Sequence, residues 1–231
     1  DHNNIQLGFN RLAILDPSEK GNQPMISQNG KWVIIMNGEV YNFPEIRNKL
    51  GKTKADFTSQ TDTEVVLAAF ETWGIEKTLE IVNGIFAIAL YDRSNKKIHL
   101  IRDFAGVKPL YFGLSNNCVV FASQYDQIFN HPAFEGNLIP KKESLTDFVR
   151  MGYIPAPNAF FKNTWQVRPG EIVTINQQMD INKEIYYCFP QSIIEYKETD
   201  SQAIEKLDFI LSEVVRSQLI SDVPIGAFLS G

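Results

Sequence analysis

Four polar positions in three separate segments form a set that could bind a free amino acid. Arg11 lies in one apolar stretch, Asn37-Gly38-Glu39 interrupts a second, and Asp62 precedes a third. An arginine can hold a carboxylate through two parallel hydrogen bonds, and two acids can pair with an ammonium group. An asparagine amide beside a glycine N–H offers neutral donors that could stabilise an oxyanion at an acyl carbon. This set suits chemistry on an α-amino acid.

Each of these residues also has a simpler explanation when it is taken alone. Arg11 could be an edge residue that reaches to water, and this is the commoner case for a lone arginine in a strand. Asn37-Gly38 has the composition of an ordinary turn, and Asp62 could cap the helix that follows it. The chemical interpretation therefore requires that the surrounding elements bring the residues into one cavity.

The elements predicted around these residues are strands and helix starts. Leu7–Asp16 is predicted as a strand that carries Arg11, and Trp32–Met36 as a buried strand that the Asn37-Gly38-Glu39 corner breaks. Pro44–Leu50 is predicted as a short helix. The polar stretch before Val65 is typical of a helix N-terminus, with a hydroxyl or carboxylate cap and an acid in the first turn.

The rest of the chain predicts an α+β fold. One antiparallel meander is expected from the strands Gly84–Asp92, Ile98–Asp103, Pro109–Gly113 and Cys118–Ala122. Further helices are expected at Glu76–Val82, Ser123–Phe129 and Ser144–Gly152. Further strands are expected at Ile172–Ile175 and in a final short stretch that Tyr186-Tyr187 closes. Strands with separate helices and no βαβ alternation indicate an α+β layered domain. Residues 190–200 have the composition of a linker, and an apolar helical pattern over 201–220 then precedes a predicted strand, Ile225–Leu229.

The composition of the 231 residues restricts the class of protein. Hydrophobic residues make up 44% of the chain, which supports a packed core. The 22 basic and 27 acidic side chains give a net charge of −5, which disfavours nucleic acid as a partner. No apolar run is long enough to span a membrane. Cys118 and Cys188 lie far apart, as in a reduced cytoplasmic protein, and His2, His99 and His131 form no metal-ligand pattern.

A series of motifs resembles glutamine-hydrolysing asparagine synthetase. In chain order they are GFNRLAILD, VIIMNGEVYNFPEIR, SQTDTEV, NGIFAIALYD, IRDFAGVKPLY, FASQ, VRPGE and SDVPIGAFLSG. The resemblance implies a glutaminase domain over residues 1–190, built as a four-layer αββα sandwich of the N-terminal-nucleophile type. It implies that residues 191–231 are a linker and the first helix and strand of an α/β synthetase domain of the ATP pyrophosphatase type. ATP and Mg²⁺ would serve there to activate aspartate, and ammonia from glutamine would give asparagine, AMP and pyrophosphate. A homodimer of the whole protein is compatible with the resemblance.

The same resemblance assigns roles to particular residues. Arg11 would bind the glutamine α-carboxylate within a binding segment made of Arg11, Leu12, Ala13, Ile14 and Leu15. Glu39 and Asp62 would hold the α-ammonium group, and Asn37 with the Gly38 N–H would form the oxyanion hole. At the far end of the chain, Leu229 and Ser230 would belong to the loop that cradles the pyrophosphate end of ATP.

One feature of the family is absent from this sequence. The nucleophile of the family is an N-terminal cysteine whose own amine acts as base, whereas this chain starts with Asp1 and neither cysteine matches. The RGPD-type segment that precedes the arginine in the family is also absent, so the chain is expected to be an inactive fragment. Two alternatives stay open: a related amidotransferase or β-lactam-synthetase-like enzyme with another acceptor, and a non-catalytic scaffold domain.

Overall fold

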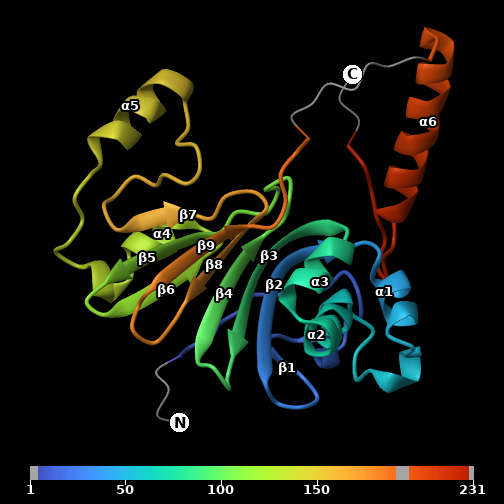
Figure 1. Cartoon of the computed structure of the whole chain (residues 1–231), viewed down its shortest axis with the longest axis horizontal. Coiled ribbons are helices and arrows are strands. Elements are labelled where there is room, and N and C mark those ends of the chain that lie inside the picture. Colours follow the sequence, from blue (N-terminus) through green and yellow to red (C-terminus); the bar gives the residue numbers. More distant parts are fainter. Residues whose placement is uncertain (1–4, 191–197, 229–231) are drawn as a thin grey trace.

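The computed structural model describes residues 5–190 and 198–228 (Figure 1). The strands are β1 (Met25–Ile26), β2 (Trp32–Val40), β3 (Gly84–Asp92), β4 (Lys97–Arg102), β5 (Tyr111–Ser115), β6 (Cys118–Ala122), β7 (Thr164–Gln166), β8 (Glu171–Ile175) and β9 (Ile181–Ile185). The helices are α1 (Phe43–Lys49), α2 (Asp62–Trp73), α3 (Ile75–Ile81), α4 (Tyr125–Phe129), α5 (Lys142–Met151) and α6 (Asp200–Ser217). Short 3-10 turns lie at Glu19–Gly21, Lys54–Asp56 and Pro132–Phe134.

The strands form two antiparallel sheets. The larger sheet has the order β1-β2-β3-β4-β8-β9, and the smaller one has the order β6-β5-β7. β3 lies inside the larger sheet, and its register with β2 pairs Gly38 with Phe86. Its run of apolar side chains is buried along almost its whole length, because both faces of the sheet are covered. The bounds predicted for β3 and β6 from the sequence are confirmed.

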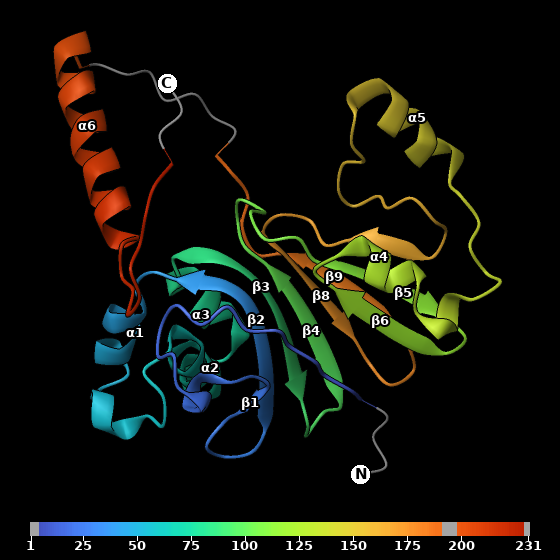
Figure 2. The same ribbon diagram turned by 180° about the vertical axis from the view of Figure 1, so that it is seen from behind.

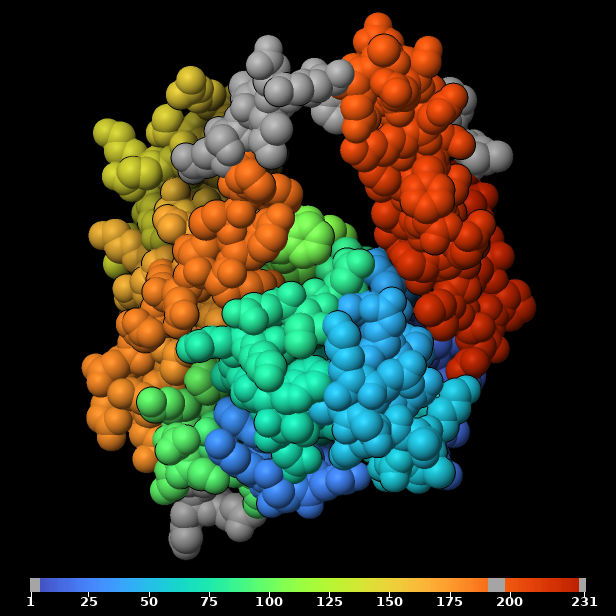
Figure 3. Space-filling model, turned by 45° about the vertical axis from the view of Figure 1, so that its right-hand side comes forward, coloured from blue at the N-terminus to red at the C-terminus, as the bar shows by residue number. Residues whose placement is uncertain are grey.

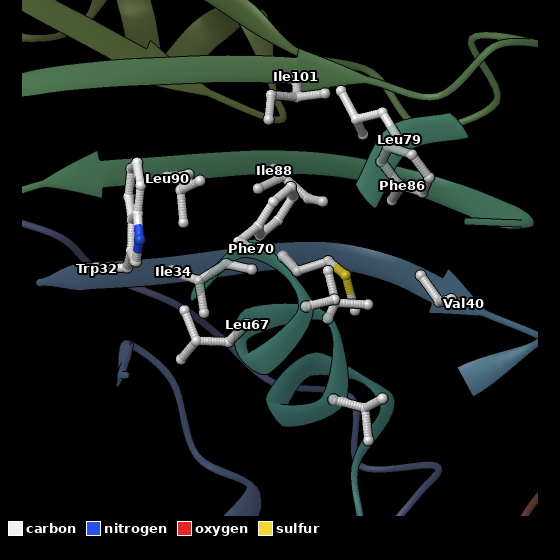
Figure 4. Close-up of a cluster of buried hydrophobic side chains, with 14 of the residues drawn as sticks. Trp32, Ile34, Val40, Leu67, Phe70, Leu79, Phe86, Ile88, Leu90 and Ile101 are labelled. Atoms are coloured by element: carbon white, nitrogen blue, oxygen red, sulfur yellow. The ribbon is translucent and has the colours of Figure 1, made fainter. Parts of the chain in front are cut away.

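Two hydrophobic cores define the layers. The first lies between the larger sheet and helices α1, α2 and α3, and Figure 4 shows Leu67 and Phe70 of α2 packed against Ile34 and Ile88 of the sheet. The second lies between the two sheets and includes Leu100 and Phe112. Helix α4 packs on β5 and β6, so that the order of layers is helices, sheet, sheet and helix. The α+β sandwich predicted from the sequence is confirmed.

The predicted strand at Leu7–Asp16 is wrong. This stretch is a coil, drawn in blue in Figure 2, that runs from the N-terminal end toward β2 and α2. Leu12 is 83% exposed, and Asp16 has a φ of 48°, which is outside the strand region. The physical reason is local: the Arg11 guanidinium bonds to carbonyl groups four to seven residues further on, which curls the chain.

The other differences concern where strands end and which sheet they join. The Asn37-Gly38-Glu39 corner is no turn, because β2 continues through it to Val40. The expected single meander is divided, since β5 pairs with β6 and β7 in the second sheet. The last strand of the sandwich is β9 at Ile181–Ile185, which pairs with β8 and ends directly before the Tyr186-Tyr187 pair that was expected to close it. Strands β1 and β7 were not predicted.

The helix predicted for residues 201–220 is confirmed as α6, and the strand after it is not. Thr199 caps α6, and Gln202 completes a capping box with it. Figure 3 shows α6, in orange to red, rising above the light-blue part of the surface that contains α1. Residues 225–228 are not in a strand: Phe228 is fully exposed, and no strand among the described residues pairs with this segment. Leu229 and Ser230 lie outside the described residues.

Candidate active site

One cavity brings together the polar residues that the sequence singled out. It has a volume of about 140 Å³ and lies between the coil that carries Arg11, the end of β2 and the start of α2. It is lined by Phe9, Asn10, Arg11, Leu12, Ile14, Leu15, Gln23, Met36, Asn37, Gly38, Glu39, Thr61, Asp62, Thr63 and Lys108. Of the predicted segment Arg11–Leu15, four residues line the cavity and Ala13 does not.

The end of β2 presents Asn37 and Gly38 to this cavity. Gly38 has a φ of 146°, and a side chain there would run into the backbone of Ile85 and Phe86 on β3. The position therefore requires glycine for close strand packing. The Asn37 amide donates to the hydroxyl oxygen of Ser123, at 3.2 Å, immediately after β6. An asparagine amide has two N–H groups, so this bond fixes the amide and leaves one donor for a ligand.

Asp62 is held at the first turn of α2 by two short hydrogen bonds. Its Oδ2 accepts from the Val40 N–H and its Oδ1 from the Thr63 N–H, both at 2.8 Å. Thr61 is the helix cap, so the capping alternative for Asp62 is not needed to explain the helix start. Burial, together with the nearby charge of Glu39, raises the pKa of Asp62 to about 6. A ligand ammonium group at this carboxyl would favour its charged form.

Arg11 lies at the cavity wall with its guanidinium partly engaged. It donates to the carbonyl oxygens of Leu15 and Asp16, both at 2.6 Å, and of Ser18 at 2.9 Å. A guanidinium carries five N–H donors, so these three bonds leave two for a ligand. Any side chain at Gly21 would collide with this guanidinium, so the absence of a side chain at Gly21 leaves the space that the guanidinium occupies. That Arg11 binds a carboxylate stays a prediction.

The sequence did not point to Gln23 as a site residue. Its side-chain oxygen accepts from the Met36 N–H at 2.6 Å, and its amide nitrogen donates to the Met36 carbonyl at 3.2 Å. The same nitrogen reaches the Thr63 hydroxyl at 3.4 Å. Gln23 therefore fixes the backbone directly before Asn37 and connects β2 to α2. A glutamine is an ordinary surface residue in sequence terms, and no local pattern marked this one.

A loop after β4 brings Lys108 to the cavity. The carboxylate of Asp103 is fully buried and accepts three backbone N–H groups of the loop, from Ala105 at 3.1 Å, Val107 at 3.0 Å and Lys108 at 3.1 Å, and a fourth from Phe86 on β3 at 3.3 Å. Four donors on one carboxylate make the loop rigid. The sequence assigned no role to Lys108, which lies between the predicted strands Ile98–Asp103 and Pro109–Gly113.

The loop is also held from its other side by Arg102. The guanidinium donates to the carbonyl oxygens of Gly106 at 2.6 Å, Lys108 at 2.8 Å and Val167 at 2.8 Å. Tyr186 in turn donates its hydroxyl to the Arg102 carbonyl oxygen at 2.8 Å. The adjacent Arg102 and Asp103 thus satisfy carbonyl and amide groups of the same loop.

The two cysteines lie away from this cavity. Cys118 is half-buried at the start of β6, and Cys188 is exposed. Neither thiol is among the residues that line the described cavity. Across the described residues, no helix combines the length and the apolar character that crossing a membrane requires.

Sequence comparisons connect this chain to asparagine synthetases. It is 30% identical to asparagine synthetase [glutamine-hydrolyzing] 1 of Bacillus subtilis over 98% of this chain and 35% of the relative. It is 31% identical to a putative asparagine synthetase of Methanocaldococcus jannaschii and 32% identical to asparagine synthetase 2 of Bacillus subtilis, again over 98% of this chain. The chain spans 31% to 46% of the length of these relatives.

Comparisons with solved structures and with a family model give the same relationship to glutamine amidotransferases. Glutamine phosphoribosylpyrophosphate amidotransferase from B. subtilis matches with a TM-score of 0.50 at 19% identity, over 74% of this chain and 33% of that chain. A solved allosteric regulatory enzyme of purine biosynthesis has the same TM-score over 75% of this chain and 33% of its own. The family model described as "Glutamine amidotransferase domain" matches residues 1–187. The chain therefore belongs to the glutamine amidotransferase domain family.

Proposed function

We propose that the cavity between the coil, β2 and α2 binds L-glutamine for release of its side-chain nitrogen. The α-carboxylate lies at the free donors of Arg11, and the α-ammonium group lies between Glu39 and Asp62. The side-chain carbonyl lies at the amide of Asn37 and the N–H of Gly38. These two donors stabilise the oxyanion that forms when the carbonyl is attacked.

A single observation supports this proposal most strongly. Arg11, Asn37, Gly38, Glu39 and Asp62, which lie up to 51 positions apart (62 − 11), line one cavity. Ordinary roles as an edge residue, a turn and a cap would not require this convergence. The cavity, at about 140 Å³, is also small beside the roughly 300 Å³ and more of pockets for drug-sized ligands. Such a size suits the head of a free amino acid rather than a peptide.

For the whole protein we propose glutamine-dependent asparagine synthesis. Residues 1–190 would be the glutaminase domain, and residues 191–231 the linker and start of a synthetase domain. That domain would use ATP and Mg²⁺ to adenylate aspartate in the cytoplasm, with Leu229 and Ser230 at the nucleotide. Ammonia would then give asparagine, AMP and pyrophosphate. The support is the similarity to the asparagine synthetases of B. subtilis and M. jannaschii, together with the glutamine cavity.

Two measurements test the proposal. Calorimetric titration of this chain with L-glutamine should give binding, and glutaramate, which lacks the ammonium group, should bind far more weakly. In the full-length protein, Arg11→Ala should raise the KM for glutamine strongly and leave ammonia-dependent asparagine formation unchanged. Equal loss of both activities would show that Arg11 acts on the whole fold rather than on the glutamine carboxylate.

A further inference from the structure

The cavity contains one more cation than a bound zwitterion uses. Its charged lining residues are Arg11, Glu39, Asp62 and Lys108. In the function proposed above, Arg11 pairs with the α-carboxylate of glutamine, and the two acids pair with its α-ammonium group. The amide at the other end of glutamine is neutral. Lys108 therefore has no charged partner on the substrate.

The position of Lys108 is tied to the acyl end of the cavity. Its backbone N–H donates to Oδ2 of Asp103 at 3.1 Å, and the same oxygen accepts the N–H of Phe86. Phe86 is the β3 partner of Gly38, which belongs to the proposed oxyanion hole. Lys108 is thus anchored through one carboxylate to the strand pair that carries Gly38. Arg11, in contrast, is anchored to carbonyl groups of its own coil.

The ammonium group of Lys108 is available for a ligand. The residue is half-buried, and within residues 5–190 and 198–228 its Nζ makes no hydrogen bond or ion pair. The loop below it is held by the buried Asp103 and Arg102, so the backbone of Lys108 is fixed before a ligand arrives. A preorganised cation in a partly enclosed site favours negative charge placed beside it.

Hydrolysis of glutamine creates negative charge at this end of the cavity. Attack on the side-chain carbonyl gives an oxyanion, the C–N bond then breaks to release ammonia, and water supplies the oxygen of the new γ-carboxylate of glutamate. We propose that Lys108 contacts the acyl end of the bound amino acid and stabilises this charge. It is then a specificity residue that favours glutamate and the oxyanion over the neutral amide. This inference rests on the proposed glutamine site.

The test compares two ligands that differ only at the acyl end. L-glutamine and L-glutamate are titrated by calorimetry into the protein and its Lys108→Met variant at pH 7.5 and low salt. Loss of a charged hydrogen bond should raise the Kd of glutamate about tenfold and change the Kd of glutamine less than about twofold. Lys108→Arg should restore glutamate binding to within about threefold. Lys142→Met removes a lysine from the exposed face of α5 and serves as the matched control.

The outcomes separate the proposed role of Lys108 from the proposed glutamine site. An equal loss of both ligands in Lys108→Met, or no loss of either, would overturn the role of Lys108 and leave the glutamine site standing. Failure of the unaltered protein to bind either ligand would overturn the glutamine site itself. Should Lys108→Met not fold, as judged by circular dichroism, Lys108→Gln gives the same comparison with a hydrophilic side chain.

Discussion

Arg11 and Arg102 make the same contacts in two very different places. Each guanidinium donates three hydrogen bonds to backbone carbonyl groups, Arg11 to those of its own coil and Arg102 to two in the loop after β4 and to that of Val167. Arg102, at the end of β4, is 7% exposed, whereas Arg11 is half-buried at the edge of the cavity. Both arginines line a cavity, but the one beside Arg102 is lined mainly by aromatic and apolar residues, whereas the one beside Arg11 also contains the carboxylates of Glu39 and Asp62.

Asp103 in the loop and Asp62 in the cavity differ in how many hydrogen bonds their carboxylates accept. Asp103 collects four backbone N–H groups and is completely buried. Asp62 is almost as buried, but its two short hydrogen bonds come from Val40 and Thr63, and burial and Glu39 hold its pKa near 6. The carboxylate of Asp103 is fully hydrogen-bonded by the protein and holds the loop after β4 in place. The carboxylate of Asp62 receives fewer hydrogen bonds, and it lies in the cavity.

The largest effect is expected from Arg102. Arg102→Met leaves the carbonyl oxygens of Val167, in a buried place, and of Gly106 and Lys108, in partly buried places, without their donor. We expect the free energy of unfolding to fall by about 3 kcal/mol or more. Arg11→Met should cost less than about 1 kcal/mol, because water can reach its carbonyl partners. Urea unfolding of both variants measures this, and equal losses would contradict a structural role for Arg102 that Arg11 does not share.

Glutamine affinity should depend on Arg11 through its shape as well as its charge. Arg11→Lys keeps the charge and loses the two-pronged geometry, so the Kd of glutamine is expected to rise about 30-fold. The decarboxylated analogue 4-aminobutanamide should bind the protein and the variant equally. A matching loss for the analogue would mean that Arg11 shapes the cavity instead of binding the carboxylate.

The raised pKa of Asp62 predicts opposite pH trends for binding and stability. Since the folded-state pKa of about 6 lies above the ordinary value of 3.8, Asp62 favours the folded chain at low pH. That contribution is complete below about pH 4 and is lost as pH rises through 6. Binding of an ammonium ligand needs the carboxylate, so glutamine affinity should fall by up to about tenfold per pH unit below 6.

Calorimetry and thermal unfolding between pH 4.5 and 7.5 measure both trends. Asp62→Asn should abolish this part of each pH dependence and weaken glutamine binding at neutral pH. Asp126→Asn, on the first turn of α4, is a control outside the cavity. Affinity that stays constant from pH 7.5 to 5 would contradict an ionised Asp62 at the ammonium group.

The smallest effect is expected at Ser123. Its hydroxyl accepts the Asn37 amide, so Ser123→Ala removes the orientation of that amide and keeps the amide itself. In the full-length protein we expect the kcat for glutamate release to fall about threefold, against about 100-fold for Asn37→Ala. A variant Ser123→Ala that loses as much as Asn37→Ala would place the hydroxyl in direct contact with substrate.

Much of the fold was predictable because a long apolar run bounded by polar residues indicates where a buried strand begins and ends. Gly84–Asp92 and Cys118–Ala122 are strands over the ranges that their apolar runs predict. The division into two sheets was not predictable, because it depends on the loop that Arg102 and Asp103 hold together. The wrong prediction of a strand at Leu7–Asp16 also comes from side-chain contacts with the backbone. The Arg11 guanidinium bonds to the carbonyl groups of Leu15, Asp16 and Ser18, and these bonds override the apolar composition of the segment.

The site divides in a similar way. Arg11, Glu39 and Asp62 stand out by charge in apolar surroundings, and Asn37-Gly38 by an interrupted strand, so chemistry alone selected them. Gln23 and Lys108 act through backbone contacts that need the folded chain, and no sequence pattern marks such contacts. The interpretation of Gly38 also changed: the space beside it is occupied by β3, so its freedom serves strand packing as well as the ligand.

The central claim is that the cavity holds the head of a free amino acid. A crystal structure of this chain grown with L-glutamine tests it most directly. We expect the α-carboxylate within hydrogen-bond distance of Arg11, the α-ammonium group between Glu39 and Asp62, and the side-chain carbonyl at Asn37. Glutamine bound elsewhere, or bound in the cavity with its ends exchanged, would contradict the claim.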